Sequence, residues 1–279
     1  MASQKLPEFV LFGDSLTQWS FYESNQGCGW FLMGKYANKI RIVNEGNNHS
    51  YRHLSYTSDT LKANFREIIK RATTPTEAPT LLFTIWVGAN DACFVGSREY
   101  VPLPAFEENI RLYVDTILSE TSMANTNIVL LTPPPINIPD TRYDDGGVDI
   151  GPAGAVERDP KQERGYRTYM SKKRYAEKVM EIAGSYDDTG RVAGLHLWRA
   201  FVDAALADQN RLGDEDAYTE DRLPGCGLKG AKQFKQGYFD DGLHLDALGY
   251  NLVSTALLEV VLGKWPELAP ERIQTSTQI

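Results

Sequence analysis

The stretch FVLFGDSLTQW, residues 9–19, runs from four apolar residues into Gly13, Asp14 and Ser15. The apolar run predicts a buried strand, and Gly13 permits a tight turn from this strand into a helix. In an open parallel sheet, ligands bind beyond the carboxyl ends of the strands, which is where Ser15 falls. Ser15 is therefore either a nucleophile facing a crevice, beside backbone N–H groups that bind an oxyanion, or the cap of the helix.

Similar apolar runs recur along the chain, and each is followed by a segment long enough to hold a helix. Their β-branched and aliphatic residues predict strands buried on both faces of a parallel sheet. The predicted strands are Phe9–Gly13, Ile40–Gly46, Thr80–Asn90, Asn127–Pro135 and Val192–Trp198. Apolar residues at helical spacing predict helices over Thr57–Ala72, Pro104–Glu120, Lys161–Ala183 and Asp246–Leu262. This alternation predicts an α/β domain of three layers with right-handed crossovers.

Nothing in the sequence resembles a linker, so we expect one domain over residues 1–279 with a core at about 8–263. Two segments interrupt the alternation. Residues 136–162 are rich in Gly, Pro and Asp, and residues 208–236 are polar with several glycines. Loops of this length in a compact domain are usually functional or mobile.

The composition limits the classes of partner. With 29 basic and 37 acidic residues the net charge is −8, which argues against nucleic acid as a partner. No apolar run approaches the roughly 20 residues of a membrane span, and the first residues lack the apolar core of a secretory signal. Cys28, Cys93 and Cys226 form neither a disulfide framework nor a metal knuckle. We expect free thiols in a cytoplasmic protein.

Two further stretches carry residues suited to nucleophilic catalysis. In "YFDDGLHLDALGY", Asp241 and His244 are three residues apart just before the last predicted helix, so the carboxylate can reach the imidazole. The alternative for this pair is a solvated turn. In "VGANDACF", Asn90 follows the end of a strand, where its amide is either an oxyanion donor or a helix cap. All three stretches belong to one rim of the predicted fold.

These blocks resemble the SGNH or GDSL family of serine esterases. "FGDSLTQ", "VGANDA" and "DGLHLDALGY" match its first, third and last blocks, and "LLTPPPIN" is similar to the branch of isoamyl acetate-hydrolysing esterases. The resemblance implies a flavodoxin-like sheet of about five parallel strands and no metal or cofactor. It implies that Ser15 is the nucleophile, His244 the base and Asp241 its orienting acid. The oxyanion donors would be the Ser15 N–H and the Asn90 amide. We further assign three residues to substrate binding: Asp14, Gly88 and Trp19.

The second block departs from the family pattern. The stretch "NEGNNHSYRHLSYTSDTL" provides Gly46 for the first glycine, but the second glycine, expected to donate an N–H to the oxyanion, is absent. His49 replaces it if no gap is introduced, and Ser55 replaces it if "NNHSYR" is an insertion. Either residue still has a backbone N–H, although its side chain narrows the acyl pocket or opposes a positive φ angle.

The other histidines point to no metal site. His49 and His53 lie four residues apart among Asn and Ser without an obvious third ligand, and His196 lies in an apolar run as a core residue. The sequence thus predicts a serine esterase that hydrolyses acetyl-type esters of small alcohols through an acyl-enzyme. The alternatives are an acyltransferase with the same triad and a weakly catalytic binding protein with an altered second block.

Overall fold

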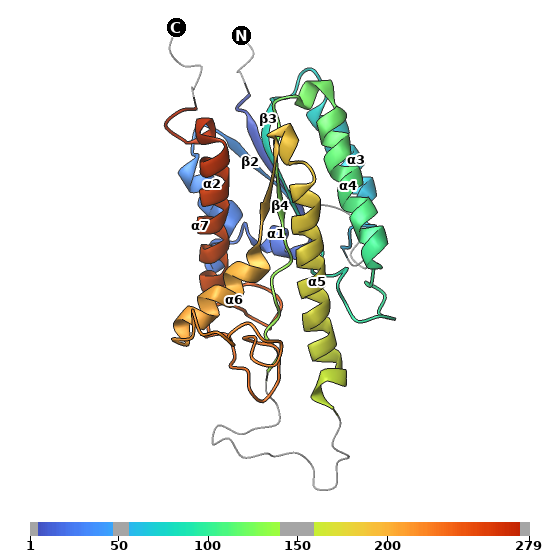
Figure 1. The fold of residues 1–279 in the computed structure, drawn as a ribbon. Coiled ribbons are helices and arrows are strands. Elements are labelled where there is room, and N and C mark those ends of the chain that lie inside the picture. The colour runs from blue at the N-terminus through green and yellow to red at the C-terminus, as the bar shows by residue number, and fades with distance from the viewer. Residues whose placement is uncertain (1–4, 47–55, 140–158, 274–279) are drawn as a thin grey trace.

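A computed structural model describes residues 5–46, 56–139 and 159–273, and within them five strands form a single parallel sheet (Figure 1). The strands are β1 (Glu8–Gly13), β2 (Arg41–Gly46), β3 (Thr80–Trp86), β4 (Asn127–Leu131) and β5 (Val192–Leu195). Their order across the sheet is β2-β1-β3-β4-β5, and every neighbouring pair is parallel. The predicted α/β fold with about five parallel strands is confirmed.

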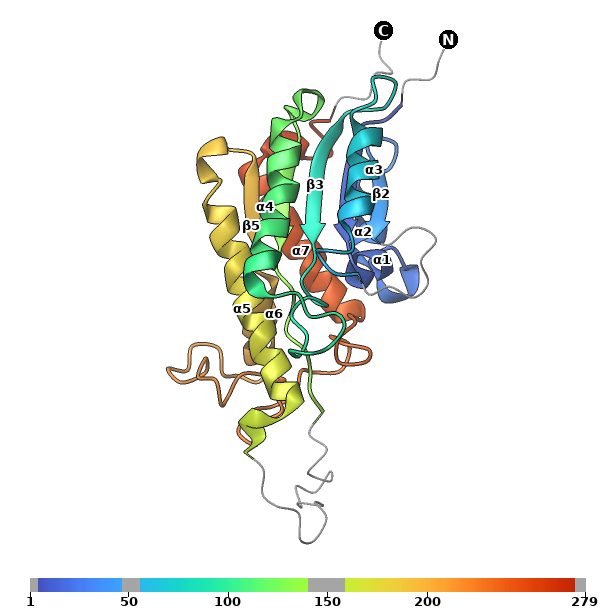
Figure 2. The same ribbon diagram turned by 90° about the vertical axis from the view of Figure 1, so that its right-hand side faces the viewer.

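Helices cover both faces of this sheet (Figures 1 and 2). They are α1 (Ser15–Trp19), α2 (Cys28–Lys35), α3 (Lys62–Ala72), α4 (Leu103–Ser119), α5 (Arg164–Gly184), α6 (Leu197–Asp208) and α7 (Ala247–Lys264). One apolar core joins the sheet to α1, α2, α6 and α7, and a second joins its other face to α3, α4 and α5. No described helix has both the length and the apolar composition needed to cross a membrane.

The register of the strands brings three loops to one edge of the sheet. Gly13 at the end of β1 pairs with Gly46 at the end of β2 and with Trp86 at the end of β3. Strand order reverses at β1, because the chain leaves it for β2 on one side and later returns to β3 on the other. Such a reversal creates a crevice at the carboxyl ends of the strands, and Ser15 and Asn90 both follow strands that end there.

Gly13 allows β1 and α1 to pass close to β3. A Cβ atom at this position would lie 2.2 Å from the Trp86 carbonyl oxygen and 2.2 Å from the Thr17 hydroxyl oxygen. Asp14 N–H then donates to the same Trp86 carbonyl at 3.3 Å. The turn that delivers Ser15 is therefore fixed against the neighbouring strand.

Several predicted boundaries were wrong. β3, β4 and β5 end three or four residues before the predicted limits. A turn at Gly88 follows β3, prolines from Pro133 follow β4, and α6 starts at Leu197 soon after β5. The helix expected from Thr57 begins at Lys62, since residues 57–60 form a turn in which the Thr57 and Thr60 hydroxyls bond each other. Helices α2 and α6 were not predicted. The α2 sequence has no acidic residue in its first turn and weak helical periodicity, and α6 begins inside the segment predicted as the fifth strand.

The long loop after α6 is packed rather than free. Residues 209–236 contain no helix or strand, yet Ala217, Leu223, Cys226 and Leu228 are buried against α5 and α6. The loop thereby forms a third apolar cluster beside the carboxyl edge of the sheet. Most of the other predicted loop, residues 140–158, lies outside the described residues.

Candidate active site

Ser15 is the first residue of α1, and Asp14 is its N-cap. Asp14 has extended backbone angles, and its Oδ1 accepts a hydrogen bond from the Leu16 N–H at 2.9 Å. The cap alternative for Ser15 is therefore wrong, since Asp14 fills that position. Among the described residues none accepts a bond from the Ser15 N–H, as expected at the start of a helix. The Ser15 hydroxyl is half-buried.

Asp241 and His244 lie in a tight loop closed by a β-bridge between Phe239 and Leu245. The Asp240 N–H donates to the His244 carbonyl at 2.9 Å. Inside the loop, Asp241 Oδ1 accepts bonds from the N–H groups of Leu243 at 2.9 Å and His244 at 2.8 Å. The three-residue spacing thus places the acid and the imidazole in one local turn, before α7 starts at Ala247.

A continuous chain of hydrogen-bond contacts joins the two ends of the sequence. His244 Nε2 lies 3.1 Å from Ser15 Oγ, and His244 Nδ1 lies 2.7 Å from Asp241 Oδ2. When Nδ1 carries the proton and donates it to the carboxylate, Nε2 accepts from the serine hydroxyl. This arrangement can remove a proton from Ser15 and hold the resulting imidazolium against a negative charge.

The Asp241 carboxyl remains ionised in this arrangement. Partial burial alone would raise its pKa, but the hydrogen bonds from the His244 ring and from the backbone N–H groups outweigh it and hold the pKa below its ordinary value. An ionised Asp241 fixes both the orientation and the tautomer of the imidazole.

Trp19, at the end of α1, covers one face of the imidazole. The two rings are stacked with centroids 4.0 Å apart and planes inclined by 19°. The sequence predicted that Trp19 binds substrate. Its position beside His244 is compatible with that role, which stays a prediction. The opposite end of α1 is also fixed, because Tyr250 on α7 donates to the Leu16 carbonyl at 2.8 Å.

Asn90 follows β3 in a turn that begins at Gly88. Gly88 has φ of +112°, a conformation that side chains rarely adopt. The Asn90 Nδ2 donates to the Tyr56 carbonyl at 2.9 Å, which leaves its second amide hydrogen for another acceptor. Asn90 does not cap a helix, because the next helix, α4, starts only at Leu103.

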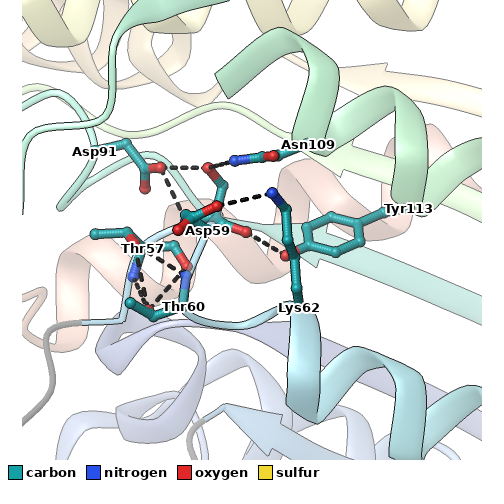
Figure 3. Close-up of polar contacts among 8 residues, drawn as sticks. Thr57, Asp59, Thr60, Lys62, Asp91, Asn109 and Tyr113 are labelled. Carbon is teal, nitrogen blue, oxygen red and sulfur yellow. Dashed lines mark hydrogen bonds and ion pairs between the residues drawn. The ribbon is translucent and has the colours of Figure 1, made fainter. Parts of the chain in front are cut away.

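Ser58 ties the Asn90 turn to the segment after β2 through a polar network (Figure 3). Asp91 Oδ1 accepts from the Ser58 N–H at 2.9 Å and from its hydroxyl at 2.5 Å. Asn109 donates to the same hydroxyl at 2.9 Å, and the Tyr113 hydroxyl donates to the Ser58 carbonyl. Sequence reasoning missed this network, whose only signal was a cluster of small polar residues after the second block.

The assignment of Asp14 and Gly88 to substrate binding stays a prediction. The Asp14 side chain is fully buried, and its Oδ1 caps α1. Gly88 is buried too, and its visible role is the positive φ angle of the turn. Burial raises the pKa of Asp14 to about 7.

Two other sequence predictions have different outcomes. His196 is a half-buried N-cap of α6 and not a core residue, because its Nδ1 accepts from the Arg199 N–H at 3.3 Å. His49 and Ser55, the alternative donors of the second block, lie outside the described residues, as does His53. Within residues 5–46, 56–139 and 159–273 no three His, Cys, Asp or Glu side chains gather in a way that could hold a metal ion.

The parallel sheet carries a Ser15–His244–Asp241 chain of contacts at its carboxyl edge, and comparison with known proteins gives the class of the protein. The chain belongs to the GDSL-like lipase/acylhydrolase family, whose profile matches residues 9–257. It is accordingly a carboxylic ester hydrolase, as the resemblance of its sequence blocks implied.

The chain is similar to other esterases over nearly its whole length. It is 28% identical over 279 residues to the isoamyl acetate-hydrolyzing esterase of Saccharomyces cerevisiae, covering 96% of this chain and 91% of that protein. A GDSL esterase/lipase of Arabidopsis thaliana is 26% identical over 272 residues, covering 96% and 89%.

Solved structures support the fold. An acetylxylan esterase, Axe2, from Geobacillus stearothermophilus has a TM-score of 0.52 at 16% identity, with 93% of this chain and 95% of that chain covered. A carbohydrate acetylesterase family member from Sinorhizobium meliloti has a TM-score of 0.51 at 14% identity, with 94% and 100% covered.

Proposed function

We propose that the protein is a serine esterase that hydrolyses acetyl-type esters of small alcohols through an acyl-enzyme. The observation that carries this proposal is the continuous chain from Ser15 Oγ to His244 at 3.1 Å and from His244 to Asp241 at 2.7 Å. A serine hydroxyl at its ordinary pKa is a weak nucleophile and needs such a base.

In the first half-reaction, Ser15 Oγ attacks the ester carbonyl carbon while His244 Nε2 takes the hydroxyl proton. The carbonyl oxygen becomes an oxyanion, which the Ser15 N–H and the free amide hydrogen of Asn90 would bind. The tetrahedral intermediate then expels the alcohol oxygen, and the imidazolium returns the proton to it. An acetyl-Ser15 ester and a free alcohol result.

In the second half-reaction, water replaces the alcohol. His244 Nε2 takes a proton from the water as its oxygen attacks the acyl carbon of acetyl-Ser15. The same donors bind the second oxyanion, and Ser15 Oγ leaves with the proton from the imidazolium. Carboxylic acid is released and the free hydroxyl is restored. Asp241 stays ionised throughout and holds the imidazolium.

The preference for short acyl groups draws on two lines of support. The yeast relative, which aligns over most of both chains, is named for hydrolysis of isoamyl acetate. The indole of Trp19, flat against His244, forms an apolar wall next to the nucleophile. An apolar wall suits a small acyl or alkyl group better than a charged one.

Labelling with a fluorophosphonate, followed by mass mapping of the adduct, tests the nucleophile directly. We expect a single adduct on the peptide containing Ser15 and none in Ser15→Ala. A panel of p-nitrophenyl acetate, butyrate and octanoate, together with isoamyl acetate, tests the acyl preference, and kcat/KM should fall as the chain lengthens. An adduct elsewhere, or full activity of Ser15→Ala, would remove the assignment.

A further inference from the structure

Lys172, on the face of α5 that packs against the sheet, is buried in an unusual way. Only 2% of its surface is exposed, and lysines are almost never fully buried unless paired. Its ammonium Nζ donates a hydrogen bond to the Ala89 carbonyl oxygen, directly before Asn90. Among the described residues, this ammonium forms no direct ion pair. The cation therefore lies behind the turn that carries the proposed oxyanion donor.

Two buried carboxylates face the same region. Asp14 directly precedes Ser15, Asp91 directly follows Asn90, and neither side chain is exposed to solvent. Each uses its Oδ1 atom as an acceptor, Asp14 for the Leu16 N–H and Asp91 for Ser58. Each keeps a buried Oδ2 atom without a hydrogen-bond partner in the described part of the chain. Buried carboxylate oxygens in this state are costly unless a cation balances them.

Asp14, Asp91 and Lys172 form a cluster with two acidic groups and one basic group, so its net charge is −1 when all three are ionised. Asp14 and Asp91 repel each other, and Lys172 attracts both. Burial raises the pKa of Asp14 to about 7 and that of Asp91 to about 6, and Lys172 opposes both shifts. Burial also lowers the pKa of Lys172, which the two carboxylates oppose. The charge of each group thus influences the pKa of another member of the cluster.

Other titratable groups around the cluster do not balance it. The Cys93 thiol faces Lys172, the Tyr250 hydroxyl faces Asp14, and the Tyr113 and Tyr175 hydroxyls face Asp91. Burial raises the pKa of all three tyrosines far above their ordinary value, so they stay neutral. Lys172 opposes the pKa increase of both carboxyls and also bonds the turn at the Ala89 carbonyl.

We propose that Lys172 is a positioning residue for the oxyanion site: its buried ammonium holds the Ala89 carbonyl and balances Asp14 and Asp91. This proposal rests on the proposed esterase function. Holding the Ala89 carbonyl fixes the peptide that leads into Asn90, and balancing the carboxylates fixes the starts of α1 and of the 88–92 turn. Lys172 touches neither the nucleophile nor the imidazole.

Two substitutions separate a charge effect from a packing effect. Lys172→Met keeps the length of the side chain and removes its charge, whereas Lys172→Arg keeps the charge and changes the shape. We expect Lys172→Met to lower kcat for p-nitrophenyl acetate at least about tenfold with KM changed less than about threefold, because the displaced donors act in the transition state. Lys172→Arg should retain more of kcat than Lys172→Met.

Lys173→Met is the matched control, since Lys173 is the next residue on the same helix and pairs with Glu177 at the surface. It should leave kcat within twofold of the wild type. If Lys172→Met keeps more activity than Lys172→Arg, the role is packing and the proposal fails. If Lys172→Met does not fold, Lys172→Gln takes its place as the uncharged variant.

The pH dependence of thermal unfolding gives a readout that needs no activity. Without the cation, the carboxyl pKa values rise and the pair stays protonated to higher pH. The decline of Tm begins near the unfolded-state pKa of the carboxyls in every variant. In Lys172→Met it should therefore continue to a pH about one unit higher than in the wild type, and in Lys173→Met it should end where the wild-type decline ends.

The two proposals fail in distinguishable ways. A wild-type protein that hydrolyses no ester and resists fluorophosphonate contradicts the proposed function, and the Tm shift alone then decides whether Lys172 balances the carboxylates. An active wild type with equal kcat and equal Tm profiles in Lys172→Met and Lys173→Met overturns the role of Lys172 and leaves the esterase standing.

Discussion

The indole of Trp19 lies against the imidazole of His244, with ring centroids 4.0 Å apart and planes inclined by 19°. Trp19 ends the same short helix that Ser15 begins, so one element of five residues supplies both the hydroxyl and a support for its partner. The imidazole is held on one side by the Asp241 carboxylate and on its flat face by the indole. The hydrogen bond and the stack together restrict rotation of the imidazole.

Trp19→Leu should lower kcat/KM for acetate esters about tenfold, because stacking of this kind contributes about 1 kcal/mol and also holds the ring in line with Ser15. Trp19→Phe should recover most of the loss. Steady-state kinetics with p-nitrophenyl acetate measure both. The matched control is Trp30→Leu on α2, where the indole is exposed, and this variant should leave kcat/KM unchanged. Equal activity of the two leucine variants would contradict a role for the stack.

Asp241→Asn should lower kcat by about 10⁴-fold, because a neutral amide favours the wrong imidazole tautomer and cannot stabilise the imidazolium. The amide oxygen can still accept the bonds from the Leu243 and His244 N–H groups, so Tm should change little. Asp240→Asn, one residue earlier on the exposed side of the loop, serves as the control. A loss below tenfold would mean that another group orients His244.

Asp14→Asn should stabilise the protein at about pH 8 by roughly 1–3 kcal/mol. The folded-state pKa of Asp14 is raised from 3.8 to about 7, so the folded protein binds this proton more tightly than the unfolded chain. Native stability therefore falls as the pH rises between these two values and stays reduced above them. Asparagine avoids this cost and can still cap α1 through its oxygen.

Urea unfolding from about pH 4 to about pH 8 tests this, since the difference from the wild type should shrink toward acid pH. Exposed Asp59→Asn is the control for a charge removed at the surface. A difference that is constant across the range would show that Asp14 is ionised in the fold throughout.

Ser58→Ala should lower the free energy of unfolding by about 2–3 kcal/mol, because it leaves the Asp91 carboxylate and the Asn109 amide without their shared hydroxyl. Chemical denaturation measures the change. Ser119→Ala provides the comparison, because its exposed hydroxyl bonds only a carbonyl of its own helix, and it should change stability by less than about 0.5 kcal/mol. Equal effects would mean that the network in Figure 3 contributes nothing.

The sequence was sufficient for the sheet and for the residues of the proposed triad. Buried strands such as β1 carry continuous apolar runs, and a parallel sheet brings whatever follows each strand to one edge. That rule alone predicts that Ser15 and Asn90 follow strands which end at the same edge, and β1 and β3 do end side by side there. The D-x-x-H spacing then predicted a local contact between Asp241 and His244, which is the contact in the structure.

The rest depended on tertiary packing that no local pattern encodes. The stack of Trp19 on His244 joins residues far apart in the chain, and so does the hydrogen bond from the Ser58 hydroxyl to Asp91. The sequence does not distinguish Lys172 from the other cations of α5, and only the packing of α5 shows that its side chain is buried. Helix α2 was missed because it is apolar with weak periodicity.

The order of parts along the chain has a consequence for biosynthesis. The hydroxyl of Ser15 and the imidazole of His244 are separated by 229 positions, and Tyr250 on α7 bonds the Leu16 carbonyl near the start of α1. A growing polypeptide on the ribosome would expose its serine long before any base exists to activate it. Reactivity toward esters would then appear only after the segment that carries His244 has been synthesised, so that shorter products remain inert.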